Sequence, residues 1–68
     1  MLKPYQTRVI EEKAELDEKR ARLLNFFQTE GFASLSEAER VRMRWQEKIM
    51  HAYSDILLER IAAFGASP

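Results

Sequence analysis

The clearest indication of the fold lies in residues 38–64, AERVRMRWQEKIMHAYSDILLERIAAF. At roughly 100° per residue, this stretch forms one long helix with two neighbouring apolar stripes. The first stripe consists of Ala38, Trp45, Ile49, Ala52, Tyr53, Ile56, Ala63 and Phe64. The second stripe consists of Met43, Met50, Leu57 and Ile61. Together they are wider than the contact with one partner helix requires, so we expect a further surface to cover part of this helix.

The residues before this stretch predict one more helix. Pro4 suits a first helical turn, where a missing N–H costs nothing, and the helix-forming composition continues to about Thr29. Gly31 then predicts a stop with a left-handed C-terminal cap. Ser34 with Glu37 and Ser36 with Glu39 both have the spacing of a capping box, and we predict that the second helix starts near Ser36.

We therefore predict an all-α fold, an antiparallel hairpin of two long helices at about 4–29 and 36–64, joined by about six residues. Gly65 is the expected cap at the second end. The whole chain, residues 1–68, forms a single helical-hairpin domain in this interpretation.

The first helix carries an apolar seam that we expect to form the hairpin contact. Val9, Leu16 and Leu23 follow one another at intervals of seven, as in a coiled coil. We expect this seam to pack on the first stripe of the second helix, while the second stripe meets other subunits. The seam side consists of Leu2, Tyr5, Val9, Leu16, Leu23 and Phe27, and Phe32 and Leu35 are expected to close the hairpin end.

Composition leaves self-association as the way to stabilise so short a chain. A core in 68 residues rarely supplies more than about 3–5 kcal/mol. The chain has no Cys and one His, which excludes disulfides and gives no set of metal ligands, so no cofactor or metal is expected. We therefore predict a symmetric homo-oligomer.

Charge argues against nucleic acid, and hydropathy argues against membranes. Eleven basic and eleven acidic residues give a net charge of zero, without the basic excess that DNA and RNA binders use. No apolar run approaches the roughly 18 residues of a membrane span. A soluble protein of the cytoplasm is the expectation.

We also expect no enzyme, because neither a catalytic triad nor a glycine-rich phosphate loop can be built from these residues.

Cations near the apolar faces are the candidate binding residues. Lys13 and Arg20 fall close to the seam, where their stems cover apolar surface and their charges reach water or a partner Glu. The alternative is an anion pocket in which a ring such as Tyr5 stacks on a base and cations meet phosphate. Arg8 and Lys19 form a basic pair on the adjoining face.

Two arginines on the first stripe leave a similar choice open. Arg42 and Arg60 either pair with Glu across a subunit contact, or line a phosphate site where copies of the helix converge. Trp45 and Tyr53 suit core or interface anchors better than stacking platforms. His51 is expected at the surface.

A family resemblance rests on the order of residues along nearly the whole chain. The run Tyr5 to Lys19, YQTRVIEEKAELDEK, is followed by Phe32, Leu35, Gln46, Met50, Tyr53-Ser54, Ile56-Leu57, Arg60-Ile61 and Phe64. This order resembles the short helical-hairpin proteins of bacteriophages that counter CBASS and Thoeris immunity. The chain departs from their pattern at Ala21, where a small hydroxyl residue is expected, and at Trp45.

The resemblance implies a nucleotide sponge, commonly a hexamer, that holds cyclic oligonucleotide signals such as cyclic GMP-AMP intact between subunits. It implies that Tyr5 and Lys19 bind cyclic dinucleotides, and that Arg60 belongs to a separate site for cyclic trinucleotides. Arg8 is a further candidate ligand-binding residue because it forms the basic pair with Lys19. The residues alone also leave two other functions open. One is a protein-interaction module without a nucleotide ligand, and the other is an RNA-binding hairpin dimer.

Overall fold

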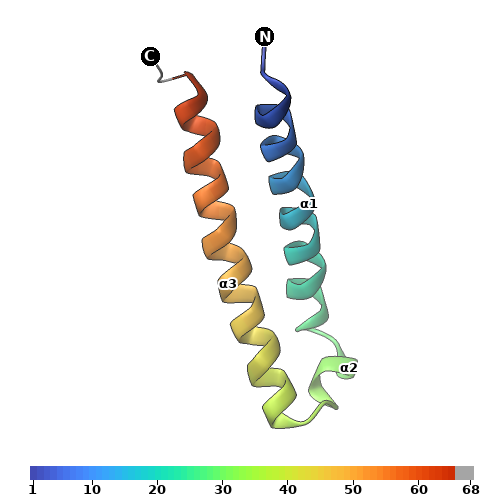
Figure 1. Ribbon diagram of the computed structural model, residues 1–68. Helices are drawn as coiled ribbons and strands as arrows, with labels where there is room; N and C mark the ends of the chain where they lie inside the picture. The colour runs from blue at the N-terminus through green and yellow to red at the C-terminus, as the bar shows by residue number, and fades with distance from the viewer. Residues whose placement is uncertain (66–68) are drawn as a thin grey trace.

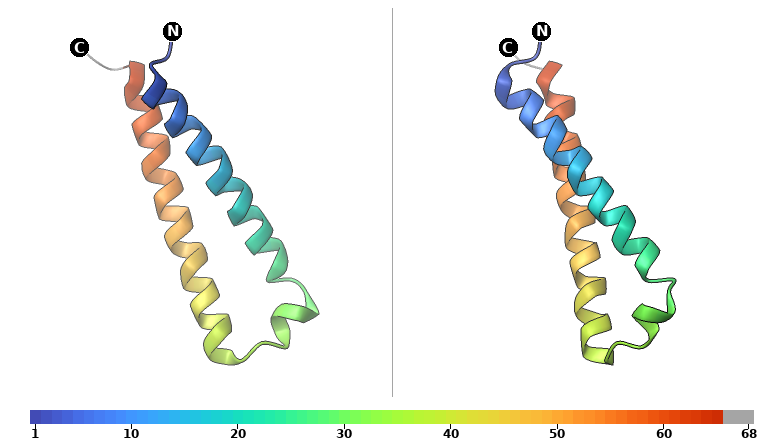
Figure 2. Two further views of the ribbon diagram at one scale, coloured as in Figure 1. Left: turned by 45° about the vertical axis from the view of Figure 1, so that its right-hand side comes forward. Right: turned by 90° about the vertical axis from the view of Figure 1, so that its right-hand side faces the viewer.

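The computed structural model describes residues 1–65 and shows two long antiparallel helices (Figure 1). Helix α1 spans Pro4–Phe26 and helix α3 spans Glu37–Ala62. A short helix, α2, Glu30–Ala33, lies in the connection, and a 3-10 turn, η1, Ala63–Gly65, follows α3. The described residues measure 51 × 15 × 14 Å, and the start of α1 lies beside η1 at the end opposite the connection (Figure 2). The predicted all-α hairpin is confirmed.

Both long helices begin where the sequence predicts. Pro4 occupies the first turn of α1. Ser36 caps α3, because its hydroxyl accepts a hydrogen bond from the Glu39 amide at 3.1 Å. The Glu39 carboxylate accepts a hydrogen bond from Arg42 Nε at 2.8 Å instead. The cap of α3 therefore contains the serine half of the predicted capping box and not the glutamate half.

The end of the first helix was predicted wrongly. Helix α1 ends at Phe26, and Thr29 begins a new turn: its hydroxyl donates to the Phe26 carbonyl at 2.7 Å and accepts from the Phe32 amide at 3.2 Å. Gly31 lies inside α2 and Gly65 inside η1, and neither has a positive φ. Both predicted left-handed caps are therefore wrong, and the connection is longer than six residues.

Burial of Phe32 explains the extra turn. This side chain is only 3% exposed, and its ring lies 5.9 Å from the Phe26 ring and 4.8 Å from the Phe27 ring, between centroids. The Arg44 guanidinium of α3 lies over two of these rings, 5.3 Å from the Phe27 centroid and 5.1 Å from the Phe32 centroid. The chain turns back after α1 because only then does Phe32 reach this cluster, as expected for the residue that closes the hairpin.

The predicted pairing of apolar stripes is also wrong. The second stripe faces α1: Leu57 is completely buried and Met43, Met50 and Ile61 are partly buried. Most of the first stripe points away from α1, with Trp45 at 66% and Ile49 at 67% exposure. Phe64, at the end of this stripe, meets Tyr5 of α1. The two stripes adjoin each other, so periodicity alone could not choose between them.

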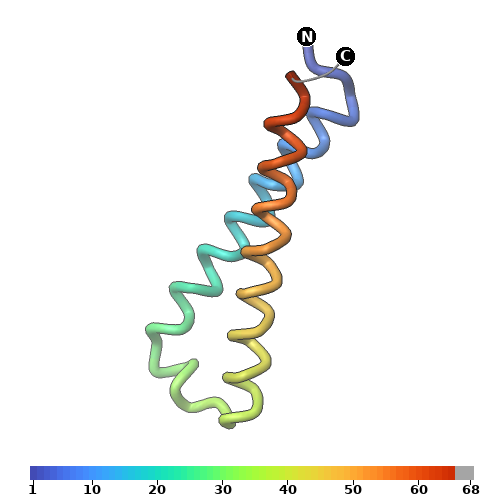
Figure 3. The backbone as a smooth tube through the Cα atoms, turned by 90° about the vertical axis from the view of Figure 1, so that its left-hand side faces the viewer, coloured from blue at the N-terminus to red at the C-terminus, as the bar shows by residue number. Residues whose placement is uncertain are grey.

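The seam of α1 is largely confirmed, although it forms a small core. Val9 is 5% exposed, and Leu16, Leu23 and Phe27 are partly buried, whereas Leu2 and Tyr5 at the open end are 49% and 47% exposed. Within residues 1–65, the buried hydrophobic side chains are Val9, Phe32 and Leu57. In the view of Figure 3 the two helices cross in the half nearer the start of α1 and separate toward the connection.

Candidate functional site

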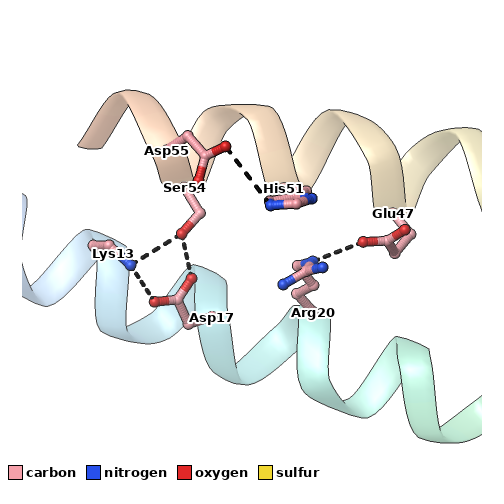
Figure 4. A network of polar contacts seen from close by, with 7 residues as sticks. All are labelled: Lys13, Asp17, Arg20, Glu47, His51, Ser54 and Asp55. Atoms are coloured by element: carbon pink, nitrogen blue, oxygen red, sulfur yellow. Dashed lines mark hydrogen bonds and ion pairs between the residues drawn. The ribbon is translucent and has the colours of Figure 1, made fainter. Parts of the chain in front are cut away.

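A polar layer crosses the middle of the hairpin (Figure 4). Lys13 Nζ donates to Asp17 at 2.6 Å and to Ser54 Oγ at 3.1 Å, and Ser54, which is 6% exposed, donates to the second oxygen of Asp17. About two turns further along both helices, Arg20 Nε donates to Glu47 at 2.7 Å. Lys13 and Arg20 thus have partners within the chain, which favours their structural interpretation over an anion pocket.

This layer also explains which stripe faces α1. Ser54 and Glu47 lie beside the second stripe on the helical projection. Turning α3 to present its first stripe would take Ser54 away from the Lys13–Asp17 pair and Glu47 away from Arg20. Arg20, whose side chain is 28% exposed, would then lose its ion pair, and a partly buried charge without a partner costs free energy.

The carboxyl group of Asp17 has a lowered pKa, below its ordinary value of 3.8. The main cause is the hydrogen bond from Lys13, followed by the one from Ser54, and the charges of Lys13 and Arg20 act in the same direction. Partial burial opposes these effects. Asp17 is therefore a carboxylate at neutral pH and has a fixed role in joining the helices.

The candidate binding site is a hollow at the open end of the hairpin, where the start of α1 lies beside the end of α3. It has a volume of about 500 Å³. Residues from the start of α1 and the end of α3 line it together: Met1, Lys3, Tyr5, Gln6, Arg60, Ala63 and Phe64. Two of the predicted site residues, Tyr5 and Arg60, are thus brought to one place from opposite ends of the sequence.

The hollow combines a fixed ring with available positive charge. Tyr5 packs edge-on against Phe64, with ring centroids 6.0 Å apart and ring planes at 83°. Tyr5 nevertheless remains 47% exposed. Arg60 is exposed, and no ion pair occupies its guanidinium among residues 1–65. An aromatic face next to an unpaired guanidinium suits a ligand with a flat base and a phosphate.

Lys19 lies outside this hollow. It is exposed on α1, fourteen positions beyond Tyr5, which corresponds to about 21 Å along a helix. Tyr5, Arg8 and Lys19 share one side of α1, within roughly 60° on the helical projection. In one chain, Tyr5 and Lys19 are too far apart to grip the same small ligand, so a shared ligand requires Lys19 from another copy.

Sequence reasoning missed Lys3 and Gln6, which also line the hollow. The Lys3 amide donates to Gln6 Oε1 at 2.8 Å and so fixes the start of α1. The predicted hairpin could have pointed to these two residues. Antiparallel helices of similar length bring the first residues of one helix beside the last residues of the other.

A second hollow, of about 530 Å³, lies on the exposed side of α3. It is lined by Val41, Arg42, Trp45, Gln46, Ile49 and Met50. His51 lies at the surface of α3, as expected, with Nε2 3.6 Å from Asp55.

A protein-family model described as Sequestin matches residues 3–63. The chain belongs to the Sequestin family. The match covers both long helices together with Tyr5, Lys19 and Arg60, and it confirms the family resemblance in the sequence. The name Sequestin is consistent with a protein that sequesters a ligand. Searches of curated proteins and of solved structures gave no match. Within residues 1–65 of this Sequestin chain, no helix has both the length and the apolarity to cross a membrane.

Proposed function

We propose that this chain is a phage anti-defence protein that binds and sequesters cyclic oligonucleotide immune signals without cleaving them. The observation that carries the proposal is the hollow at the open end, where Tyr5 and Arg60 meet with Lys3 beside them. Membership of the Sequestin family supports it independently. The ligands proposed are cyclic dinucleotides such as cyclic GMP-AMP, and cyclic trinucleotides.

The chemistry of the hollow suits such a ligand. Stacking of a base on an aromatic ring contributes about 1–3 kcal/mol per base. Hydrogen bonds from Arg or Lys to phosphate are charge-assisted and stronger than neutral ones. Sequestration requires tight binding and no catalysis. A site that is formed before the ligand arrives lowers the entropy cost of ordering its side chains on binding.

Oligomerisation belongs to the same proposal. Since Tyr5 and Lys19 lie about 21 Å apart along α1, a ligand that contacts both must lie between two copies. A twofold axis then supplies two rings and two ammonium groups, matching the two bases and two phosphates of a cyclic dinucleotide. We propose a symmetric homo-oligomer, a hexamer, acting in the cytoplasm of the infected host.

The direct test is a calorimetric titration of the purified oligomer with cyclic GMP-AMP and with a cyclic tri-adenylate. We expect saturable binding of at least one of them, and recovery of the intact nucleotide after the protein is denatured. Absence of binding to both, by an oligomer of confirmed integrity, contradicts the proposal. Recovery of a linear nucleotide contradicts its noncatalytic part.

The exposed stripe of α3 favours a second candidate, a protein-interaction module without a nucleotide ligand. Trp45 and Ile49, at 66% and 67% exposure, form the kind of apolar surface that partner proteins cover. In that case the chain binds no nucleotide in the titration and copurifies with a protein in fixed stoichiometry.

A further inference from the structure

A row of positive charges runs along one side of the first half of α3. Arg40, Arg44 and Lys48 follow one another at intervals of four residues, which corresponds to about 6 Å between neighbours along a helix. No other cations of the chain stand at this spacing. Like charges four residues apart destabilise a helix, so the row is unfavourable for α3 by itself. Other cations pair with a carboxylate three or four residues away: Lys13 with Asp17, Arg22 with Glu18 and Arg42 with Glu39.

Within residues 1–65, no carboxylate forms an ion pair with any member of this row. Arg40 Nη1 donates to the carbonyl oxygens of Ala33 and Leu35, at 2.9 and 2.7 Å, and so ties the connection to α3. The Arg44 guanidinium lies over two phenylalanine rings, and Lys48 is exposed. The positions of the two arginines are therefore fixed, while the charge of the whole row lacks acidic partners.

The row borders a hollow of about 450 Å³ to which both long helices contribute, here called the connection groove. It lies in the half of the hairpin where α1 and α3 separate toward the connection (Figure 3). Glu47 also lines the groove, but its carboxylate is held by Arg20 at 2.7 Å. The cations of the groove thus remain available to an anionic group. The other lining residues are Leu24, Phe27, Val41, Arg44, Trp45 and Lys48.

The spacing of these residues fits a second helix. Val41, Trp45 and Ile49 directly follow the three cations in the sequence, so an apolar row runs beside the charged row. These three side chains are 46%, 66% and 67% exposed. In the commonest class of helix packing, rows of residues four apart on one helix lie along the same rows of the other. A helix with one row of acids and an adjoining apolar row therefore complements both rows of α3.

The chain itself does not contain such a row of acids. Its acids stand four residues apart only in the pairs Glu11–Glu15 and Asp55–Glu59, and neither pair continues to a third acid. Four positions beyond Glu15 the chain has Lys19, which would repel the row. The charge pattern therefore points to a partner with a different sequence and not to a second copy.

We propose that the connection groove binds an amphipathic helix of another protein, with acids at every fourth position and an apolar row beside them. The acids pair with the row of cations, and the apolar side chains cover Trp45 and Leu24. The groove lies at the connection, whereas the hollow of Tyr5 and Arg60 lies at the open end. This interaction is therefore independent of nucleotide binding.

The chain supplies its own reporter, because its single tryptophan lines the groove. The probe is a synthetic peptide without Trp, of about 18 residues, with Glu at positions i, i+4 and i+8 and Leu directly after each Glu. We expect saturable binding that shifts the Trp45 emission to shorter wavelengths and weakens as NaCl rises from about 50 to 300 mM. A peptide with Lys in place of Glu, and one with the same composition but the acids spread around the helix, should bind at least about tenfold more weakly. Equal binding of all three peptides, or of none, overturns the proposal.

Matched variants locate the binding surface. Lys48→Glu should weaken binding of the acidic peptide at least about fivefold, whereas Arg42→Glu makes the same charge change on the other side of Trp45 and should have less than about a twofold effect. Leu24 and Ile10 are both 37% exposed on α1. Leu24→Glu should weaken binding at least about tenfold, and Ile10→Glu should not. Equal losses within either pair, with helix content unchanged in circular dichroism, overturn the assignment to this groove.

Sedimentation velocity separates a foreign partner from a second copy. Without peptide, Lys48→Glu and Leu24→Glu should associate as the wild type does. If both variants dissociate, or if the acidic peptide dissociates the wild-type oligomer, a second copy occupies the groove and the proposal is wrong. None of these measurements contains a nucleotide, so failure of the proposed function leaves them unaffected.

Discussion

Tyr5 and Arg60 have different tasks in the proposed site, and paired variants separate them. Arg60→Ala should lower ligand affinity at least about tenfold, because a charge-assisted bond to phosphate is lost. Arg22→Ala is the matched control, since Arg22 is an exposed arginine of α1 that pairs with Glu18 away from the hollow. Equal affinity losses for the two variants in calorimetry contradict a specific role of Arg60.

The ring of Tyr5 is expected to matter more than its hydroxyl. Tyr5→Phe retains a stacking face and the edge-on contact with Phe64, so its affinity should stay within about threefold of wild type. Tyr5→Ala removes both and should lower the affinity about tenfold or more. If Tyr5→Phe binds as weakly as Tyr5→Ala, the hydroxyl and not the ring contacts the ligand.

Asp17 links hairpin stability to pH. The pKa of Asp17 is lower in the folded chain than the ordinary value of 3.8. The contribution of its carboxylate to the unfolding free energy is therefore fully present above the ordinary pKa, and it is lost as the pH falls through the folded pKa. Asp17→Asn keeps the shape and removes the charge. Between about pH 6 and pH 2.5, the unfolding free energy should fall more steeply for wild type than for the variant, as measured by urea unfolding. Parallel slopes for the two proteins would refute this linkage.

Where each helix begins in the sequence was easier to predict than which side of α3 faces α1. Pro4 and Ser36 mark the helix starts through local hydrogen bonding, and the structure confirms both. The end of α1 depends on where Phe32 packs, which is a tertiary effect that local residue preferences do not contain. The facing stripe of α3 depends on Ser54 and Glu47, polar residues that a count of apolar positions passes over.

The rotation of α3 makes a clear prediction for two adjacent leucines. Leu57 is fully buried against α1, whereas Leu58 is 55% exposed. Leu57→Ala should lower the unfolding free energy by about 2–5 kcal/mol, the range for buried leucines. Leu58→Ala should change it by about 0.5 kcal/mol or less. Thermal unfolding followed by circular dichroism measures both, and a larger loss for Leu58→Ala means that α3 presents its other side to α1.

At the scale of the whole molecule, the sequence could place site residues on helices without showing which of them meet. The family resemblance pointed to Tyr5, Lys19 and Arg60. Folding joins Tyr5 with Arg60, because an antiparallel hairpin brings its two ends together, and it keeps Lys19 far along the same helix. The distances between copies determine the rest of the site, and those depend on contacts that one chain does not contain.

Self-association should therefore appear in the stability of the molecule as a whole. A fold that is stabilised by association has a Tm that rises with protein concentration, because the unfolded chains do not associate. Ile56 lies on the first stripe and Leu58 lies off it, yet they are nearly equally exposed, at 54% and 55%. We expect Ile56→Glu to sediment as a smaller species and to lose the concentration dependence of Tm, since a carboxylate in an apolar contact is left without a partner. Leu58→Glu introduces the same charge on the same helix and should retain both the wild-type sedimentation and the rise of Tm with concentration. If both variants dissociate equally, or neither does, the first stripe of α3 is not the surface through which the copies associate.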